Sequence, residues 1–124
     1  MELLLNPIFD LALVAARAAD EKKGVDTVVL DVGDLLAITE AFVITSAPNS
    51  RLVLFLAEEI EKAVKEAGGH GPIATEGLRD ASWVLLDFGI FVVHIFLDEV
   101  RRFYDLEHLW SGAPRVEWRE LVTA

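Results

Sequence analysis

The stretch from Trp83 to Leu97 constrains the fold most, because it is strongly apolar and is broken by Phe88-Gly89. A tight turn at these two residues predicts a β-hairpin of strands 83–87 and 90–97. Successive side chains of a strand point to opposite faces. One face is entirely apolar and is expected in the core, and it carries Val84, Leu86, Phe91, Val93 and Ile95.

The opposite face of the hairpin is apolar but includes two polar residues, Asp87 and His94. A two-residue turn sets a register in which Asp87 pairs with Ile90 and Trp83 with His94. Such a face is typical of a contact surface, and equally of a face that another helix covers. A histidine on an apolar strand favours a packed, hydrogen-bonded side chain over a metal ligand.

Upstream of the hairpin, the sequence predicts one helix followed by two strands. Asn6 and Pro7 suit a helix start, because asparagine caps free N–H groups and proline needs no partner there. Gly24 suits the end of this helix. Residues 27–32 and 41–46 are rich in β-branched and apolar side chains, and the polar residues between them allow antiparallel pairing.

A longer helix is predicted between the second strand and the hairpin, from after Asn49 to about Ala67. Leu54 and Phe55 lie outside its apolar stripe, so a second layer or a partner is needed to cover them. A homodimer scaffold would place both in a self-interface. Residues 68–82 are expected to form a loop. The predicted core stripe of the helix consists of Leu52, Leu56, Ile60, Ala63 and Val64.

After the hairpin, Asp98 is placed to cap a short helix, and helical turns continue to Trp110. Residues 111–124 lack a periodic pattern and are expected to form a tail that contains Trp118. The order of elements predicts one α/β domain over residues 1–124, with a mixed β-sheet packed with helices and a core of about 7–110. A chain of 124 residues can bury such a core without disulfides.

The charge of the chain bears on its partners. Lysine and arginine total 11 against 21 aspartates and glutamates, a net charge of −10. Nucleic-acid binding depends on basic side chains, so no nucleic acid is expected as the primary partner. A basic protein surface suits the acidic field, although the charge also serves solubility. The lack of cysteine, of a signal peptide and of an apolar span of ~20 residues predicts a cytoplasmic protein with no membrane partner.

No catalytic motif is found in the sequence. GxSxG, P-loop and GxGxxG patterns are absent, and the three histidines lack the spacing of a metal site. Asp31 and Asp34, together with Ser46, leave a nucleotide-binding enzyme or nucleotidyltransferase as an alternative, because paired carboxylates can hold magnesium. Asp34 is more typical of a turn. We therefore predict no enzyme, no cofactor and no metal site.

Directly after the hairpin, residues 101–110 combine aromatic and charged side chains. Tyr104 and Trp110 are the large apolar anchors of this run, and Arg101 and Glu107 lie between or beside them. Aromatic and arginine side chains supply much of the binding energy at protein interfaces. This run therefore indicates recognition of a protein surface.

An ordered set of residues extends this run toward the N-terminus: Glu76-Gly77, Trp83, Asp87, Gly89, Val93-His94, Arg101, Phe103-Tyr104, Leu106-Glu107 and Leu109-Trp110. This set, together with Thr45-Ser46 and Asn49-Ser50-Arg51, resembles the Iojap family of ribosomal silencing factors, RsfS. The resemblance extends from the first helix to Trp110. Ile90-Phe91 and Ser111-Gly112 depart from the pattern of many family members.

The resemblance implies a nucleotidyltransferase-like topology without known catalysis. It also implies a silencing factor that binds ribosomal protein L-fourteen on the large ribosomal subunit, blocks joining of the small subunit and represses translation under nutrient limitation, as in stationary phase. Organellar relatives act in ribosome assembly, which leaves a large-subunit assembly factor as an alternative, and dimerisation within the family leaves a homodimer open. The predicted partner-binding residues are Trp83, Asp87, His94, Arg101, Tyr104, Glu107 and Trp110. Asp87 and Glu107 are expected to pair with basic residues of the partner.

Overall fold

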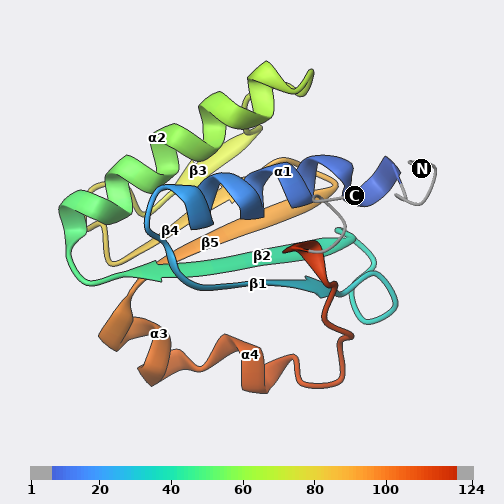
Figure 1. Cartoon of the computed structure of the whole chain (residues 1–124). Coiled ribbons are helices and arrows are strands. Elements are labelled where there is room, and N and C mark those ends of the chain that lie inside the picture. Colours follow the sequence, from blue (N-terminus) through green and yellow to red (C-terminus); the bar gives the residue numbers. More distant parts are fainter. Residues whose placement is uncertain (1–6, 120–124) are drawn as a thin grey trace.

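A computed structural model describes residues 7–119, whose five strands form a single sheet (Figure 1). The strands are β1 (Val25–Asp31), β2 (Ala41–Ala47), β3 (Ala74–Glu76), β4 (Trp83–Asp87) and β5 (Phe91–Leu97). Their order across the sheet is β1-β2-β5-β4-β3. Only β2 and β5 pair in parallel, and the other neighbours are antiparallel. The predicted mixed sheet and the predicted antiparallel pairing of the first two strands are confirmed.

Helices cover the two faces of the sheet unequally. The long helices α1 (Pro7–Glu21) and α2 (Ser50–Glu66) lie on one face, and the short helices α3 (Asp98–Tyr104) and α4 (Leu106–Leu109) lie on the other (Figure 1). This two-sided cover confirms the predicted packing of the sheet with helices. Because four- and seven-residue helices are not stable alone, tertiary contacts must hold α3 and α4 in place.

The start of α2 agrees with the prediction from the sequence, whereas the start of α3 differs from it. The Asn49 side chain accepts a hydrogen bond from the Leu52 N–H at 2.8 Å, which is the predicted cap of α2. Asp98 is the first residue of α3, not its cap; Leu97 occupies the cap position and makes no side-chain cap bond. The predicted cap of α1, Asn6, lies outside the described residues.

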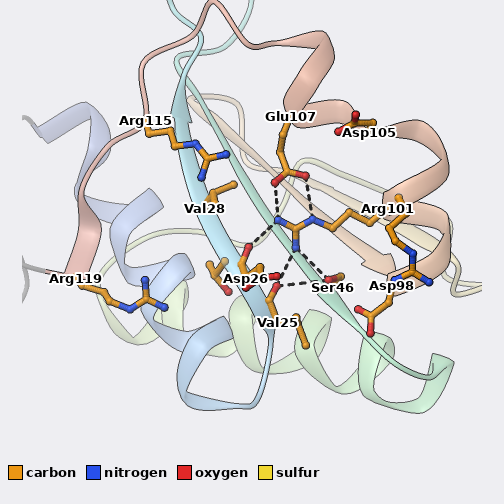
Figure 2. Close-up of a pocket in the computed structure, with 12 residues that line it drawn as sticks. Val25, Asp26, Val28, Ser46, Asp98, Arg101, Asp105, Glu107, Arg115 and Arg119 are labelled. Carbon is orange, nitrogen blue, oxygen red and sulfur yellow. Dashed lines mark hydrogen bonds and ion pairs between the residues drawn. The ribbon is translucent and has the colours of Figure 1, made fainter.

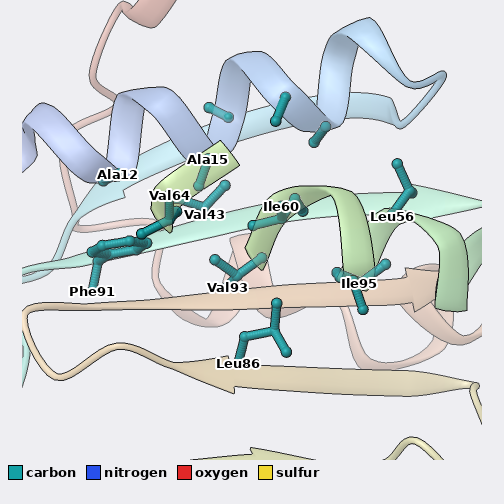
Figure 3. Packing of buried hydrophobic residues seen from close by; sticks show 14 of the residues in the cluster. Ala12, Ala15, Val43, Leu56, Ile60, Val64, Leu86, Phe91, Val93 and Ile95 are labelled. Atoms are coloured by element: carbon teal, nitrogen blue, oxygen red, sulfur yellow. The ribbon is translucent and has the colours of Figure 1, made fainter. Parts of the chain in front are cut away.

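The main core lies between the sheet and α1 and α2 (Figure 3). The predicted core face of the hairpin is confirmed, since all five of its side chains are buried. The stripe of α2 is rotated from the predicted one: Val53 and Ala57 are buried, whereas Leu52 and Ala63 are only half-buried. The small side chains of α1 allow the helix to lie close to the sheet; they include Ala12, Ala15, Ala16 and Ala19.

The register of the hairpin differs from the predicted one. Asp87 pairs with Val92 instead of Ile90, and Trp83 pairs with Phe96 instead of His94. The turn lies one residue later than predicted, at Gly89-Ile90, since the Phe88 N–H donates to the Phe91 carbonyl at 2.9 Å across these two residues. The shift is two residues, an even number, so every side chain keeps its predicted face.

The short strand β3 lies within residues predicted to form a loop. Ala74 pairs with Asp87 and Glu76 pairs with Leu85, so β3 forms the edge of the sheet beside β4. Three residues are too few to show the alternation by which a strand is recognised in a sequence. Glu76 therefore lies in a strand and not in the predicted loop.

Gly77, which follows β3, permits a close approach that a side chain would prevent. Its φ is 88°, and a Cβ atom there would overlap the carbonyl oxygen of Trp83. Gly68 has a φ of 101° with open space around it. We expect Gly77→Ala to lower the free energy of unfolding clearly more than Gly68→Ala, which meets only the backbone penalty of about 1–2 kcal/mol. Urea denaturation of both variants measures the difference; equal losses would contradict the close approach.

Along the outer edge of β1, the predicted tail is packed against the sheet as far as the structure describes it. The Asp31 N–H donates to the Pro114 carbonyl at 2.8 Å, and the Val116 N–H donates to the Val29 carbonyl at 2.8 Å. Trp118 is 4% exposed, and its Nε1–H donates to the Thr27 carbonyl at 3.1 Å. Residues 114–118 thus cover the outer edge of β1 and belong to the packed domain.

Candidate protein-docking surface

Only part of the second sheet face is covered. A smaller cluster lies between β1, β2, β5 and the segment that follows α3, and it includes Leu30, Phe42, Phe96, Leu106 and Ala113. Over β4 and β5 the face carries a groove of about 400 Å³. The predicted contact face is therefore partly covered by the segment of α3 and α4 and partly open, so only its open part is available to a partner.

Arg101 of α3 joins α3 and α4 to the sheet, and every N–H of its guanidinium group is used for this (Figure 2). Nε and Nη2 donate to the two carboxylate oxygens of Glu107 at 3.0 and 2.9 Å. Nη1 donates to the Val25 carbonyl at 2.9 Å and to Ser46 Oγ at 3.1 Å, and Nη2 donates to the Asp26 carbonyl at 2.7 Å. A guanidinium has five N–H donors, so all five are used. Arg101 is 8% exposed and anchors α3 within the chain.

A β-bulge in β1 supplies two of the acceptors for Arg101. The register with β2 shifts between Val25 and Val28, and Asp26 between them has a φ of 47°. A bulge turns backbone carbonyls out of the strand ladder. The guanidinium satisfies the carbonyls of Val25 and Asp26 there, which fixes α3 over the start of β1.

Glu107 of α4 lies across from Arg101 in an ion pair with Oε2 2.9 Å from Nη2. The hydrogen bond from Arg101 lowers the pKa of the Glu107 carboxyl below its usual value, which keeps the ion pair charged. Arg101 and Glu107, both predicted to touch a partner, therefore meet each other in this chain. The contact between Arg101 and the bulge could not be predicted from residue spacing, since 76 residues separate Arg101 from Val25.

Trp83, His94 and Tyr104 form an aromatic group beside the groove. The Trp83 Nε1–H donates to His94 Nδ1 at 3.1 Å, and the Tyr104 ring lies 5.0 Å from the Trp83 ring between centroids. Tyr104 is 53% exposed, whereas His94 is buried. Burial lowers the pKa of His94 to about 4, so the ring is neutral near pH 7. Because Nδ1 accepts from Trp83, the neutral ring carries its proton on Nε2.

Trp110 is half-buried and packs edge-to-face on Phe42, with ring centroids 5.8 Å apart. Phe42 in turn packs edge-to-face on His94 at 4.6 Å. Trp110 therefore closes the covered half of the face, while Tyr104 is open to contact. Asp87 lies at the groove, and its Oδ1 accepts a hydrogen bond from the Gly89 N–H at 2.8 Å.

Sequence reasoning missed the outer walls of the groove. Ile38 lies in the connection between β1 and β2 and is 84% exposed, and Ile73 precedes β3 and is 68% exposed. The unusual feature in the sequence was the presence of Leu35, Leu36 and Ile38 in an otherwise polar connection. That signal alone does not distinguish a wall of a groove from buried packing.

Comparison with known proteins identifies the family of this chain. Residues 6–124 match a family model described as ribosomal silencing factor during starvation. The chain belongs to the ribosomal silencing factor family, RsfS. An RsfS of Halalkalibacterium halodurans is 34% identical over 114 residues, which cover 92% of this chain and 97% of that protein.

Two further comparisons concern a solved structure and a mammalian protein. A crystal structure of a Chromobacterium violaceum protein has a TM-score of 0.79 and 34% identity, covering 84% of this chain and 86% of that chain. A mouse protein named mitochondrial assembly of ribosomal large subunit protein 1 is 29% identical over 105 residues, which cover 83% of this chain and 46% of that protein. The resemblance to RsfS is thus confirmed.

The residues considered for a nucleotide-binding site in this RsfS-family chain do not converge. Asp31 pairs with Ala41 at one end of β1, whereas Ser46 pairs with Val25 at the other end. Asp31 Oδ1 accepts from the Gly33 N–H at 3.2 Å in a turn, and Ser46 Oγ accepts from Arg101. Among residues 7–119, no three histidine, aspartate or glutamate side chains are grouped to hold a metal ion. No helix in that range is both long and apolar enough to cross a membrane.

Proposed function

We propose that this protein represses translation by binding ribosomal protein L-fourteen on the large ribosomal subunit and sterically blocking the small subunit. The open half of the second sheet face carries the proposal, because it combines exposed Tyr104 with an apolar groove in a chain of the RsfS family. The action needs no chemistry, so the protein is proposed to be no enzyme. It would act in the cytoplasm under nutrient limitation.

The residues of the proposed site form two groups, one around the groove and one already paired within the chain. Trp83, Asp87, His94, Tyr104 and Trp110 surround the groove and the aromatic group, and they are proposed to face the partner. Arg101 and Glu107 remain in the proposed site, where they support the segment that carries Tyr104 and Trp110. The net charge of −10 favours approach to a basic ribosomal protein.

A second candidate is a factor for assembly of the large subunit, which the name of the mouse relative favours. The same surface would serve either role, because both require binding to the large subunit. Sucrose gradients of cells lacking the protein separate the two. Accumulation of incomplete large subunits supports assembly, whereas unchanged subunits with excess joined ribosomes in starved cells support silencing.

We expect the purified protein to pellet with large ribosomal subunits, and Tyr104→Ala to weaken that binding about tenfold or more. The reason is that Tyr104 is the exposed aromatic of the surface, and such anchors are typically worth a couple of kcal/mol. Phe55→Ala is the matched control, since Phe55 is 42% exposed on α2 at the other face. Co-sedimentation measures both variants.

Failure of the wild type to pellet would contradict the proposed function. Binding of Tyr104→Ala as tight as that of the wild type would instead remove Tyr104 from the contact set. A light-scattering assay of subunit joining then tests silencing itself: the wild type is expected to inhibit joining, and a protein that binds without inhibiting it is no silencing factor.

A further inference from the structure

The groove beside the aromatic group has a floor of sheet residues. Leu85 and His94 face each other across β4 and β5, and Val92 of β5 pairs with Phe42 of β2. All four line the groove. Its volume of about 400 Å³ lies in the lower part of the ~300–1,000 Å³ range of ligand pockets, so it admits side chains of a docking protein.

Backbone hydrogen bonds hold the walls of the groove in place. On one side, the Thr39 side chain and the Glu40 N–H both donate to the Ile90 carbonyl at 2.8 Å. This fixes the residue next to Ile38. On the other side, the Ile73 N–H donates to the Asp87 carbonyl at 2.8 Å. Walls that are already ordered lower the entropy lost on binding.

The polar residues of the groove favour a basic occupant. Glu76 of β3 is exposed and lies on the same face as Leu85 of β4, with which it pairs. Asp87 is the last residue of β4 and also lines the groove. The residues that line the groove, all within the described range, include no lysine or arginine. His94 is neutral near pH 7, so the two carboxylates set the charge of the groove. A second copy of this acidic chain is the less suitable occupant.

His94 adds a buried donor to the lining. Its side chain is 5% exposed, and Nε2 has no hydrogen-bond partner among residues 7–119. A buried N–H without an acceptor is unfavourable. Because Nε2 is closed off from the groove, His94 contributes a neutral ring to the floor and leaves Glu76 and Asp87 to attract a basic group.

We propose that this groove receives an aliphatic side chain next to a lysine or arginine of the docking protein. The aliphatic side chain would pack between Ile38, Ile73 and Leu85, and its basic neighbour would pair with Glu76 and Asp87. This proposal rests on the proposed function and adds to it the chemistry of the partner loop. It makes Ile38, Ile73 and Glu76 part of the site.

The first test measures binding to purified large ribosomal subunits by fluorescence anisotropy at two salt concentrations. Ile73→Asp is expected to weaken binding about tenfold or more, because a hydrated carboxylate replaces the apolar wall against which the aliphatic side chain would pack. The pair Glu76→Gln and Asp87→Asn is expected to weaken it and to reduce its salt dependence, while the amide oxygen at position 87 still accepts from Gly89. Leu54→Asp on α2 is the matched control.

If the wild type binds and these groove variants bind equally well, the proposed function stands and the groove proposal is overturned. The melting temperature of each variant is measured beside its affinity. Ile73 is 68% exposed, so a loss of binding with unchanged melting supports the groove proposal. If the melting temperature of Ile73→Asp is below that of the wild type, the affinity of the double variant Glu76→Gln with Asp87→Asn decides for or against the groove proposal.

The second test does not need the ribosome. A Lys-Leu-Lys peptide with blocked ends is titrated while NMR follows the Ile38 and Ile73 methyl groups and the Trp83 indole. Saturable shifts of all three signals in the wild type support the proposal when those of Ile38 and Trp83 disappear in Ile73→Asp, and a Glu-Leu-Glu peptide should give much smaller ones. No shifts with the basic peptide would overturn it, even if subunits are bound. Sedimentation that shows a dimer lost in Ile73→Asp would name a second copy as the occupant and overturn it too.

Discussion

Arg101→Met is expected to lower the free energy of unfolding by about 3–5 kcal/mol, the usual loss when one partner of a buried ion pair is removed. The variant leaves Glu107 without its partner and frees the carbonyls of Val25 and Asp26. Those carbonyls lie at the bulge of β1, where the register with β2 shifts. Urea denaturation of the purified variant measures the loss.

Arg102→Met provides the matched control, because Arg102 is the next residue of α3 and is exposed. It should change stability by no more than about 0.5 kcal/mol. The double variant Arg101→Met with Glu107→Met should recover part of the loss, since it removes the unpaired carboxylate as well. A single Arg101→Met variant as stable as the wild type would show that the five hydrogen bonds do not hold α3 in place.

Trp118→Ala should cost about 3–5 kcal/mol of stability, which is typical of removing a buried aromatic side chain. Trp118 is 4% exposed, packs against the main core and donates to the Thr27 carbonyl. The variant loses both the packing and that hydrogen bond. Hydrogen exchange should also speed up at the amides of Asp31 and Val116, which pair residues 114–116 with β1.

Leu109→Ala serves as the comparison for Trp118→Ala. Leu109 is 70% exposed, so its loss should change stability by no more than about 0.5 kcal/mol. Equal effects of the two variants would mean that residues 114–118 do not belong to the packed domain. Chemical denaturation followed by circular dichroism suits this pair, because it does not depend on tryptophan fluorescence.

The hairpin shows how far the sequence determines the fold. Its two faces follow from alternation, and they survived the wrong register because the shift was even. The register itself depends on the connection, where Phe88 and Phe91 stack with ring centroids 4.7 Å apart. That contact lies between two residues that the sequence assigned to different parts of the hairpin. The three-residue β3 was missed because it is too short for any period to be seen.

The candidate site could be predicted in its aromatic part and not in its polar part. Trp83 and His94 were placed on one face by counting, and the structure brings Tyr104 onto that face. The contacts of Arg101 could not be predicted, because its acceptors are backbone carbonyls of a distant bulge. The groove also escaped prediction, since its walls come from separate connections that meet only in the folded chain.

The residues that cover the outer edge of β1 are synthesised long after β1 itself, which has a consequence for the nascent chain. β1 leaves the ribosome early, but the residues that shield its outer edge, 114–116, follow only after most of the chain has been made. At roughly 5–20 residues per second, the strand waits for several seconds with one edge unpaired. Unpaired edges attract other strands. A ribosome stalled before residues 114–116 emerge would therefore carry a sheet in which the outer edge of β1 is still unpaired.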